Sequence, residues 1–202
     1  MPTISRRTFM KTMAVGSGTI AYMATALTVH GAGPEVYKLR IVHTNDHHAR
    51  IEPVMNGSTP VHGGVSRRKT LIDAIRNEGG NQLLLDAGDV FQGTLYFNQY
   101  KGLADLEFYN ALKYDAVAIG NHEFDIGQAP LADYIRAANF PVLSANIQAD
   151  ATSPLAGLIK PWTVFWVGGQ AIGVIGVTTE ETAILSNPGA GVAFTSAVDA
   201  VK

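Results

Sequence analysis

Polar side chains suited to metal binding and proton transfer follow an apolar run near the middle of the chain. The run at residues 116 to 119 predicts a buried strand, and Gly120 allows the backbone to turn after it. Asn121, His122 and Asp125 come next. A carboxamide oxygen can bind a hard cation, and an aspartate three residues away can hold an imidazole in one tautomer. The spacing indicates proton delivery beside a metal ion, with helix capping by Asn121 and Asp125 as the alternative.

A second pair of candidate ligands follows a strand predicted at residues 38 to 44. Asp46 and His48 lie two positions apart in the loop after this strand. That spacing lets an oxygen and a nitrogen ligand point at one cation. The side chain of His47 would then point elsewhere, and His43, inside the strand, is predicted to pack in the core.

A third carboxylate follows a strand predicted at residues 82 to 86. Asp89 comes just after this strand, whereas Asp86, on the strand itself, is expected to bind neighbouring backbone. If the three strands are neighbours, their polar ends converge at one edge of the sheet. An oxygen-rich group with imidazole and no thiolate suits Mn²⁺, Mg²⁺, Fe or Zn²⁺ in a five- or six-coordinate site. Asp89, between two ligand sets, is the natural bridge between two metals.

Strands and helices alternate along most of the chain, which predicts an α/β fold with mostly parallel strands and helices on their faces. Two apolar runs across a Gly-Gly turn predict a hairpin near the carboxyl end. The aromatic residues between 91 and 100 either stack on a substrate or pack in the core. The expected elements are strands at 38–44, 82–86, 116–119 and 140–145, helices at 65–78, 102–112, 129–138 and from 195, a loop at 93–100 with His62 in another loop, and a hairpin within 162–179.

The composition is that of a soluble domain with a sizeable core. The chain has 202 residues, 47% of them apolar, and no cysteine, which excludes thiolate sites and disulfides. It contains 15 basic and 17 acidic residues, and three of the basic ones lie in residues 1 to 33, which contain no acid. The remaining 12 basic and 17 acidic residues give a net charge of −5, which argues against nucleic acid as a partner.

The amino-terminal segment resembles a twin-arginine export signal. Arg6, Arg7, Phe9 and Lys11 match that pattern, and a weakly apolar, uncharged stretch follows them. The resemblance implies a signal peptide at residues 1 to 33, the twin-arginine translocase as a partner during export, and a periplasmic or extracellular location. Glycine and serine dilute the apolar stretch, so stable membrane insertion is not expected. A basic, disordered tail is the alternative.

Five ordered motifs resemble those of the metallophosphoesterase (calcineurin-like) superfamily, and their residues are similar to those of its 5'-nucleotidase branch. They are His-Thr-Asn-Asp-His-His (43 to 48), Gly-Gly-Val-Ser-Arg-Arg (63 to 68), Asp-Ala-Gly-Asp-Val-Phe-Gln-Gly-Thr (86 to 94), Gly-Asn-His-Glu-Phe-Asp (120 to 125) and Gly-Val-Ile-Gly-Val-Thr-Thr-Glu (173 to 180). The resemblance implies a layered β-sheet sandwich flanked by helices (αββα). Residues 34 to 202 would be the amino-terminal part of the catalytic domain, incomplete at its carboxyl end.

The resemblance also implies roles for the strand-end residues. Asp46 and His48 would bind the first of two divalent ions (Mn, Mg, Zn, Fe or Ca), Asp89 would bridge both ions, and Asn121 would bind the second. His122 and Asp125 would form the catalytic dyad. The implied activity is hydrolysis of phosphate esters, most of all nucleotides, as in 5'-nucleotidases, UDP-sugar hydrolases and 2',3'-cyclic phosphodiesterases.

The chain departs from the family pattern after His122, its last histidine. Members of the family supply further metal-binding histidines from later strands, and a carboxy-terminal domain that binds the nucleotide base. We therefore expect this chain to be the first part of a longer enzyme. The alternatives are a non-catalytic metal- or ligand-binding remnant and a relative acting on a different ester, such as the sulfur-oxidation branch. The His122 and Asp125 pair disfavours the last.

Overall fold

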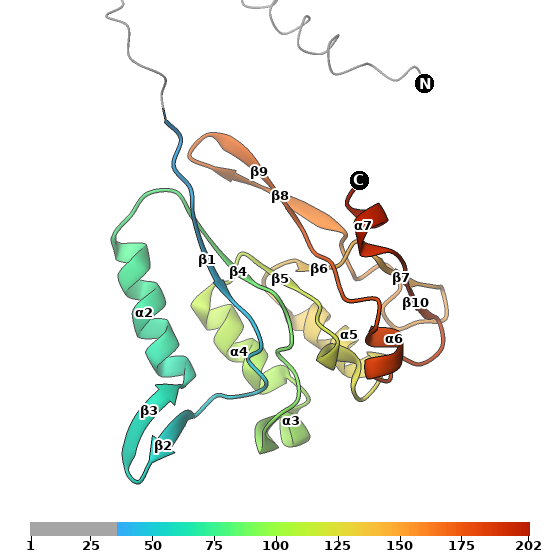
Figure 1. The fold of residues 1–202 in the computed structure, drawn as a ribbon, viewed down its shortest axis with the longest axis horizontal. Helices are drawn as coiled ribbons and strands as arrows, with labels where there is room; N and C mark the ends of the chain where they lie inside the picture. The colour runs from blue at the N-terminus through green and yellow to red at the C-terminus, as the bar shows by residue number, and fades with distance from the viewer. Residues whose placement is uncertain (1–35) are drawn as a thin grey trace, which may run out of the picture. The chain divides into compact units, whose positions relative to one another are not determined.

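Four parallel strands form the central sheet of the computed structural model, which describes residues 36 to 202. The predicted export signal lies outside these residues. The strand order is β1-β4-β5-β6 (Figure 1). Their bounds are β1 (Arg40–Thr44), β4 (Gln82–Asp86), β5 (Ala116–Ala118) and β6 (Val142–Leu143). The predicted parallel sheet is confirmed, and because strands in sequence order are neighbours, their carboxyl ends share one edge.

Three helices connect these strands and cover one face of the sheet. They are α2 (Val65–Asn77), α4 (Leu103–Leu112) and α5 (Gln128–Ala137), each within one residue of its predicted bounds at both ends. Alternate residues of the strands, such as Leu84, Val117 and Val142, pack with buried side chains of the helices in the main core. The polar ends of the strands are thus carried by a rigid helix-backed layer.

The opposite face of β1 is open. Ile41 is 55% exposed, and His43, on the same face, is also exposed. The prediction that His43 packs in the core is therefore wrong, because strand alternation turns its side chain away from the helices.

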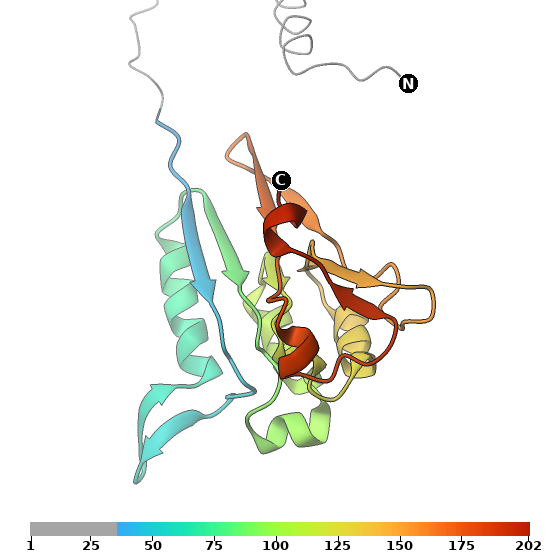
Figure 2. The same ribbon diagram turned by 45° about the vertical axis from the view of Figure 1, so that its right-hand side comes forward.

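A hairpin near the carboxyl end confirms the prediction for residues 162 to 179. It consists of β8 (Trp162–Val167) and β9 (Gln170–Ile175), antiparallel across the Gly-Gly turn. Another antiparallel pair, β7 (Ile147–Ala149) and β10 (Val192–Phe194), was not expected from the sequence. In Figures 1 and 2 this pair lies on the side of the sheet away from β1. Short helices α6 (Thr182–Leu185) and α7 (Ala197–Ala200) complete this region, and the second is the predicted last helix.

Three further expectations are corrected. Residues 93 to 100 contain a helix, α3 (Leu95–Tyr100), because the Thr94 hydroxyl accepts the Tyr96 N–H as an N-cap. His62 lies in a strand, within the hairpin of β2 (Pro53–Asn56) and β3 (Thr59–Gly63), whose largely exposed strands show no apolar alternation. The strand expected at 140 to 145 shortens to β6, since the Ser144 N–H turns to the Lys160 carbonyl.

Within the described part of the chain, no helix is long and apolar enough to cross a membrane.

Candidate metal centre

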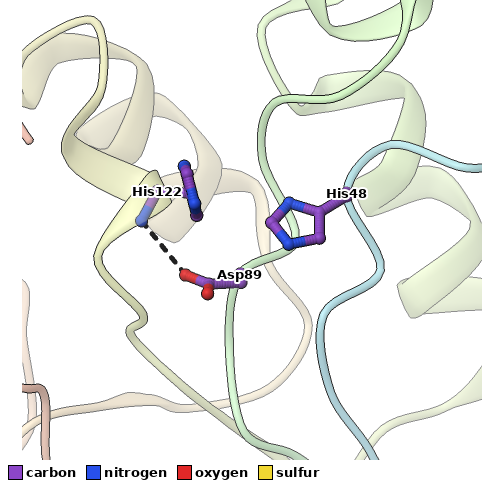
Figure 3. A group of neighbouring side chains, drawn as sticks. All are labelled: His48, Asp89 and His122. Atoms are coloured by element: carbon purple, nitrogen blue, oxygen red, sulfur yellow. Dashed lines mark hydrogen bonds between the residues drawn. The ribbon is translucent and has the colours of Figure 1, made fainter.

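Side chains from three strand ends meet at the carboxyl edge of the sheet. His48 follows β1, Asp89 follows β4 and His122 follows β5; one ligand atom of each lies within 4.8 Å of the other two (Figure 3). The centroids of the His48 and His122 rings are 4.9 Å apart, and the rings meet edge to face. Two imidazoles and a carboxylate are suitable ligands for a divalent transition metal, so the residues present fit such an ion. The group contains two of the predicted ligands, His48 and Asp89, together with His122, which was predicted to be catalytic.

The loops that carry these ligands have an uncommon backbone. Asp46, His48 and Asp89 have φ values of 52°, 49° and 57°, in the left-handed region that L-residues rarely adopt. Backbone hydrogen bonds join the loop after β1 to the loop after β4. The Asp46 N–H donates to the Gly88 carbonyl at 3.0 Å, and the His48 N–H donates to the Asp89 carbonyl at 3.0 Å. Strained residues persist only where surrounding contacts enforce them, and they often mark functional sites.

The Asp89 carboxylate lies directly against the end of β5. It accepts the backbone N–H of His122 at 3.1 Å. A Cβ at Gly120 would overlap a carboxylate oxygen and the backbone of Asp89. The chain leaves β5 and enters the next short helix at Gly120 without a left-handed φ, and the missing side chain of Gly120 is what allows this close approach.

His122 and Asp125 form the pair that their spacing predicts. Imidazole Nδ1 lies 2.6 Å from a carboxylate oxygen of Asp125. Burial lowers the pKa of His122, but the hydrogen bond and charge of Asp125, with smaller contributions from Asp89 and Glu123, raise it above its usual value. Because Nδ1 is engaged, Nε2 is the atom left for a substrate or an ion.

His48 is oriented through its other nitrogen. Its Nδ1 lies 3.2 Å from the Phe91 carbonyl, an arrangement that fixes the ring of a metal-binding histidine. Its Nε2 is 3.5 Å from the Asp46 carboxylate, whose side chain is 56% exposed. Asp46 is therefore beside His48 but outside the group of three.

Asn121 is held by a later segment. Its backbone carbonyl accepts the Ser186 hydroxyl at 2.8 Å, and its side-chain amide lies 3.5 Å from the same hydroxyl. It does not cap the short helix η2 (His122–Phe124) through its side chain. Residues 46 to 48, 89 and 121 to 125 thus occupy one edge of the sheet.

His47 points away from this edge, as expected, into a buried polar group that sequence reasoning missed. Its Nε2 lies 3.0 Å from Asp105 and its Nδ1 lies 2.8 Å from the Arg68 guanidinium. His47 and Asp105 are both almost fully buried. The signal available in the sequence was an aspartate on the apolar face of the predicted helix 102–112.

Glu123 was also missed. It is 3% exposed and accepts backbone N–H groups after both β4 and β5. Burial raises the pKa of Glu123 to about 7, although hydrogen bonds from backbone N–H groups act to lower it. Nothing in its spacing distinguished it from an ordinary helix-start glutamate.

The expectation for Asp86 is confirmed. Its carboxylate accepts the Gly88 N–H at 2.9 Å and the Tyr109 hydroxyl at 3.0 Å. Of the aromatic residues between 91 and 100, Phe91 and Phe97 are buried, and their ring centroids are 5.2 Å apart, so these two pack in the core.

The sequence model of the calcineurin-like phosphoesterase family matches residues 39 to 187. The chain belongs to this family, and the predicted metallophosphoesterase fold is confirmed. The matched family is one of phosphoesterases.

The chain is also similar to named 5'-nucleotidases. It is 47% identical to 5'-nucleotidase of Rattus norvegicus over 177 residues, which are 82% of this chain and 30% of that protein. Snake venom 5'-nucleotidase of Crotalus adamanteus is 45% identical over 174 residues, again 82% of this chain and 30% of the relative. The chain thus spans about a third of the length of the curated relatives it matches.

Solved structures of nucleotidases are also similar to this chain. The 5'-nucleotidase precursor from Thermus thermophilus matches with a TM-score of 0.76 and 53% identity, covering 81% of this chain and 33% of that chain. The NAD nucleotidase (NadN) of Haemophilus influenzae matches with a TM-score of 0.74 and 38% identity, covering 81% and 30%. A sulfate thiohydrolase (SoxB), at 17% identity and a TM-score of 0.68, covers 85% and 41% and shares the fold.

Proposed function

We propose that this chain carries the catalytic metal centre of a phosphohydrolase that acts on nucleotides. The observation that carries the proposal is the meeting of His48, Asp89 and His122, with Asp125 on the far nitrogen of His122. The names of the relatives, 5'-nucleotidases and an NAD nucleotidase, support a nucleotide substrate.

Two divalent ions would be held by the residues at the sheet edge. In this proposal Asp46 and His48 would hold the first ion, Asn121 would hold the second, and Asp89 would contact both. Bound ions of this kind supply Lewis acidity and neutralise charge on a phosphoryl group. The Asp46 side chain is 56% exposed and one of its oxygens already lies 3.5 Å from His48 Nε2, so its carboxylate is near the place of an ion beside His48.

His122 is the proposed proton donor. In the metal-free chain the Asp125 carboxylate raises the pKa of His122 and so stabilises the protonated imidazole. A protonated Nε2 can stabilise a transferring phosphoryl group and donate a proton to the departing oxygen. Asp125 keeps the ring oriented throughout.

The proposal includes export through the twin-arginine translocase. It rests on the pattern at residues 5 to 11.

The test combines metal content with phosphate release. The 202-residue chain is loaded with Mn²⁺, and bound metal and phosphate released from AMP are measured on the same sample. Metal binding that Asp89→Asn abolishes is the expected result, and Asp133→Asn, at an exposed position on α5, serves as the matched control. Phosphate release that Asp89→Asn abolishes would show that this chain alone is an active enzyme. Bound metal without phosphate release would favour an incomplete enzyme or the non-catalytic alternative, and absence of metal from the folded chain would contradict the proposed centre.

A further inference from the structure

We infer that Glu123 is a positioning residue, whose carboxylate joins the ends of β4 and β5 and sets the place of Asp89 in the candidate metal centre. The inference rests on the proposed function for the meaning of that centre. It goes further because it assigns a role to a side chain that binds neither substrate nor metal in the proposal.

The Glu123 carboxylate accepts four backbone N–H groups. One oxygen accepts those of Val90 at 2.7 Å and Phe91 at 3.1 Å. The other accepts those of Asp89 at 3.0 Å and Gly120 at 2.6 Å. Three of these donors are consecutive after β4, and the fourth lies at the end of β5, so one side chain binds two strand ends.

These donors depend on Glu123. Glu123 is 3% exposed, and its bonds from Val90 and Phe91 are buried, so water cannot replace the carboxylate at these two donors. A buried backbone N–H without an acceptor is unfavourable, and a carboxylate that accepts several such groups is held firmly in one position. The segment from 89 to 91 is therefore fixed relative to β5.

The arrangement fixes Asp89 from two sides. Glu123 binds its backbone N–H and supports its left-handed φ of 57°. The backbone N–H of His122 binds its carboxylate at 3.1 Å, in the space left by the missing side chain of Gly120. A change in the Glu123 contacts would move the Asp89 carboxylate, which is the proposed bridging ligand.

The same contacts connect Asp89 to the proposed proton donor. Glu123 follows His122 directly within η2 (His122–Phe124). The short helix therefore presents His122 to the site while its next residue binds the loop of Asp89. The single turn of η2 therefore sets the distance between the His122 imidazole and the Asp89 carboxylate.

The test is Glu123→Gln in the full chain. The amide has nearly the same shape, but only one end can accept, so its NH₂ would face two backbone N–H donors. We expect Co²⁺ affinity to fall at least tenfold, the visible absorption of the Co²⁺ protein to change, and kcat for AMP to fall more than KM changes. Glu107→Gln, at an exposed position on α4, should match the parent chain in all three.

A second measurement does not require metal. Hydrogen exchange of the metal-free parent chain should show slow amides at 89, 90, 91 and 120. In Glu123→Gln the amides that face the new NH₂ group, either 90 and 91 or 89 and 120, should exchange at least tenfold faster. Unprotected amides in the parent chain would overturn the inference, and this holds even where the variant fails to fold.

The outcomes separate this inference from the proposed function. A folded Glu123→Gln with the Co²⁺ affinity and spectrum of the parent chain overturns the positioning role and leaves the metal centre standing. A parent chain that binds no Co²⁺ contradicts the proposed centre, and the hydrogen exchange then decides by itself whether Glu123 holds the strand ends. Co²⁺ effects without any AMP turnover support the inference, whatever the activity of this chain alone.

Discussion

Hydrogen bonding at the ring nitrogens separates the roles of neighbouring histidines. Both nitrogens of His47 are used, by Asp105 and Arg68, so it has none left for a ligand. His48 and His122 each have one nitrogen held, by the Phe91 carbonyl and by Asp125, and each has a second nitrogen without a hydrogen bond, although that of His48 lies 3.5 Å from the Asp46 carboxylate. His48 and His122, but not His47, can therefore offer a ring nitrogen to a ligand.

Asp125→Asn should lower the pKa of His122 in metal-free protein. Burial alone lowers that pKa, and the carboxylate is the main group that raises it. Because the folded pKa is raised, the pair's stabilising contribution is complete below the unfolded value of about 6.5 and is lost as pH rises through the folded pKa. An NMR titration of the imidazole measures the change. Asp133→Asn should leave it unaltered, and an unchanged pKa in Asp125→Asn would refute the assignment.

At the scale of elements, the junction of α3 and α4 supports the loop of the metal centre. Lys101 and Gly102 both have left-handed φ, at 53° and 89°. A Cβ at Gly102 would overlap the ring of Phe91, which is fully buried and lies two residues after Asp89. The helix junction therefore packs directly on the segment that Glu123 binds.

Gly102→Ala should destabilise the fold by about 2 to 4 kcal/mol. Roughly half comes from placing a Cβ in the left-handed region and the rest from crowding Phe91. Gly173→Ala is the control, since Gly173 lies in β9 with open space around it, and we expect a change within about 1 kcal/mol. Urea denaturation measures both, and equal midpoints for the two variants would contradict the packing argument.

At the scale of the whole molecule, the candidate ligands come from three segments separated by long stretches of chain. The main core lies between the sheet and its helices, whereas Trp162 and Trp166 on β8 are 57% and 77% exposed. A metal bound at the sheet edge would add contacts among β1, β4 and β5 that the core does not supply. Its effect on stability should therefore be large compared with that of a surface contact.

Mn²⁺ should raise the melting temperature of the chain. An ion at about 100 times its Kd stabilises the native state by about 2.7 kcal/mol, which corresponds to roughly 5 to 10 °C for a domain of this size. Removal of metal with EDTA should reverse the shift, and Asp89→Asn should abolish it. Scanning calorimetry gives the result; the same melting temperature with and without Mn²⁺ would argue against the site.

Much of the fold could be predicted because its signals are local. The bounds of β4 and of the three covering helices follow from apolar periodicity within one element. Short pieces such as α3, β7 and β10 escaped prediction because cap bonds and long-range pairing, rather than a periodic pattern, hold them in place.

The candidate site divides in the same way. The sequence alone specified His122 beside Asp125, because a spacing of three residues within one turn brings the side chains together. The exposure of His43, the burial of His47 against Asp105 and the bonds of Glu123 to the segment after β4 were decided by the tertiary structure. Each depends on which strands are neighbours and which sheet face the helices cover, and the partners lie far apart in the chain, so no local pattern encodes them.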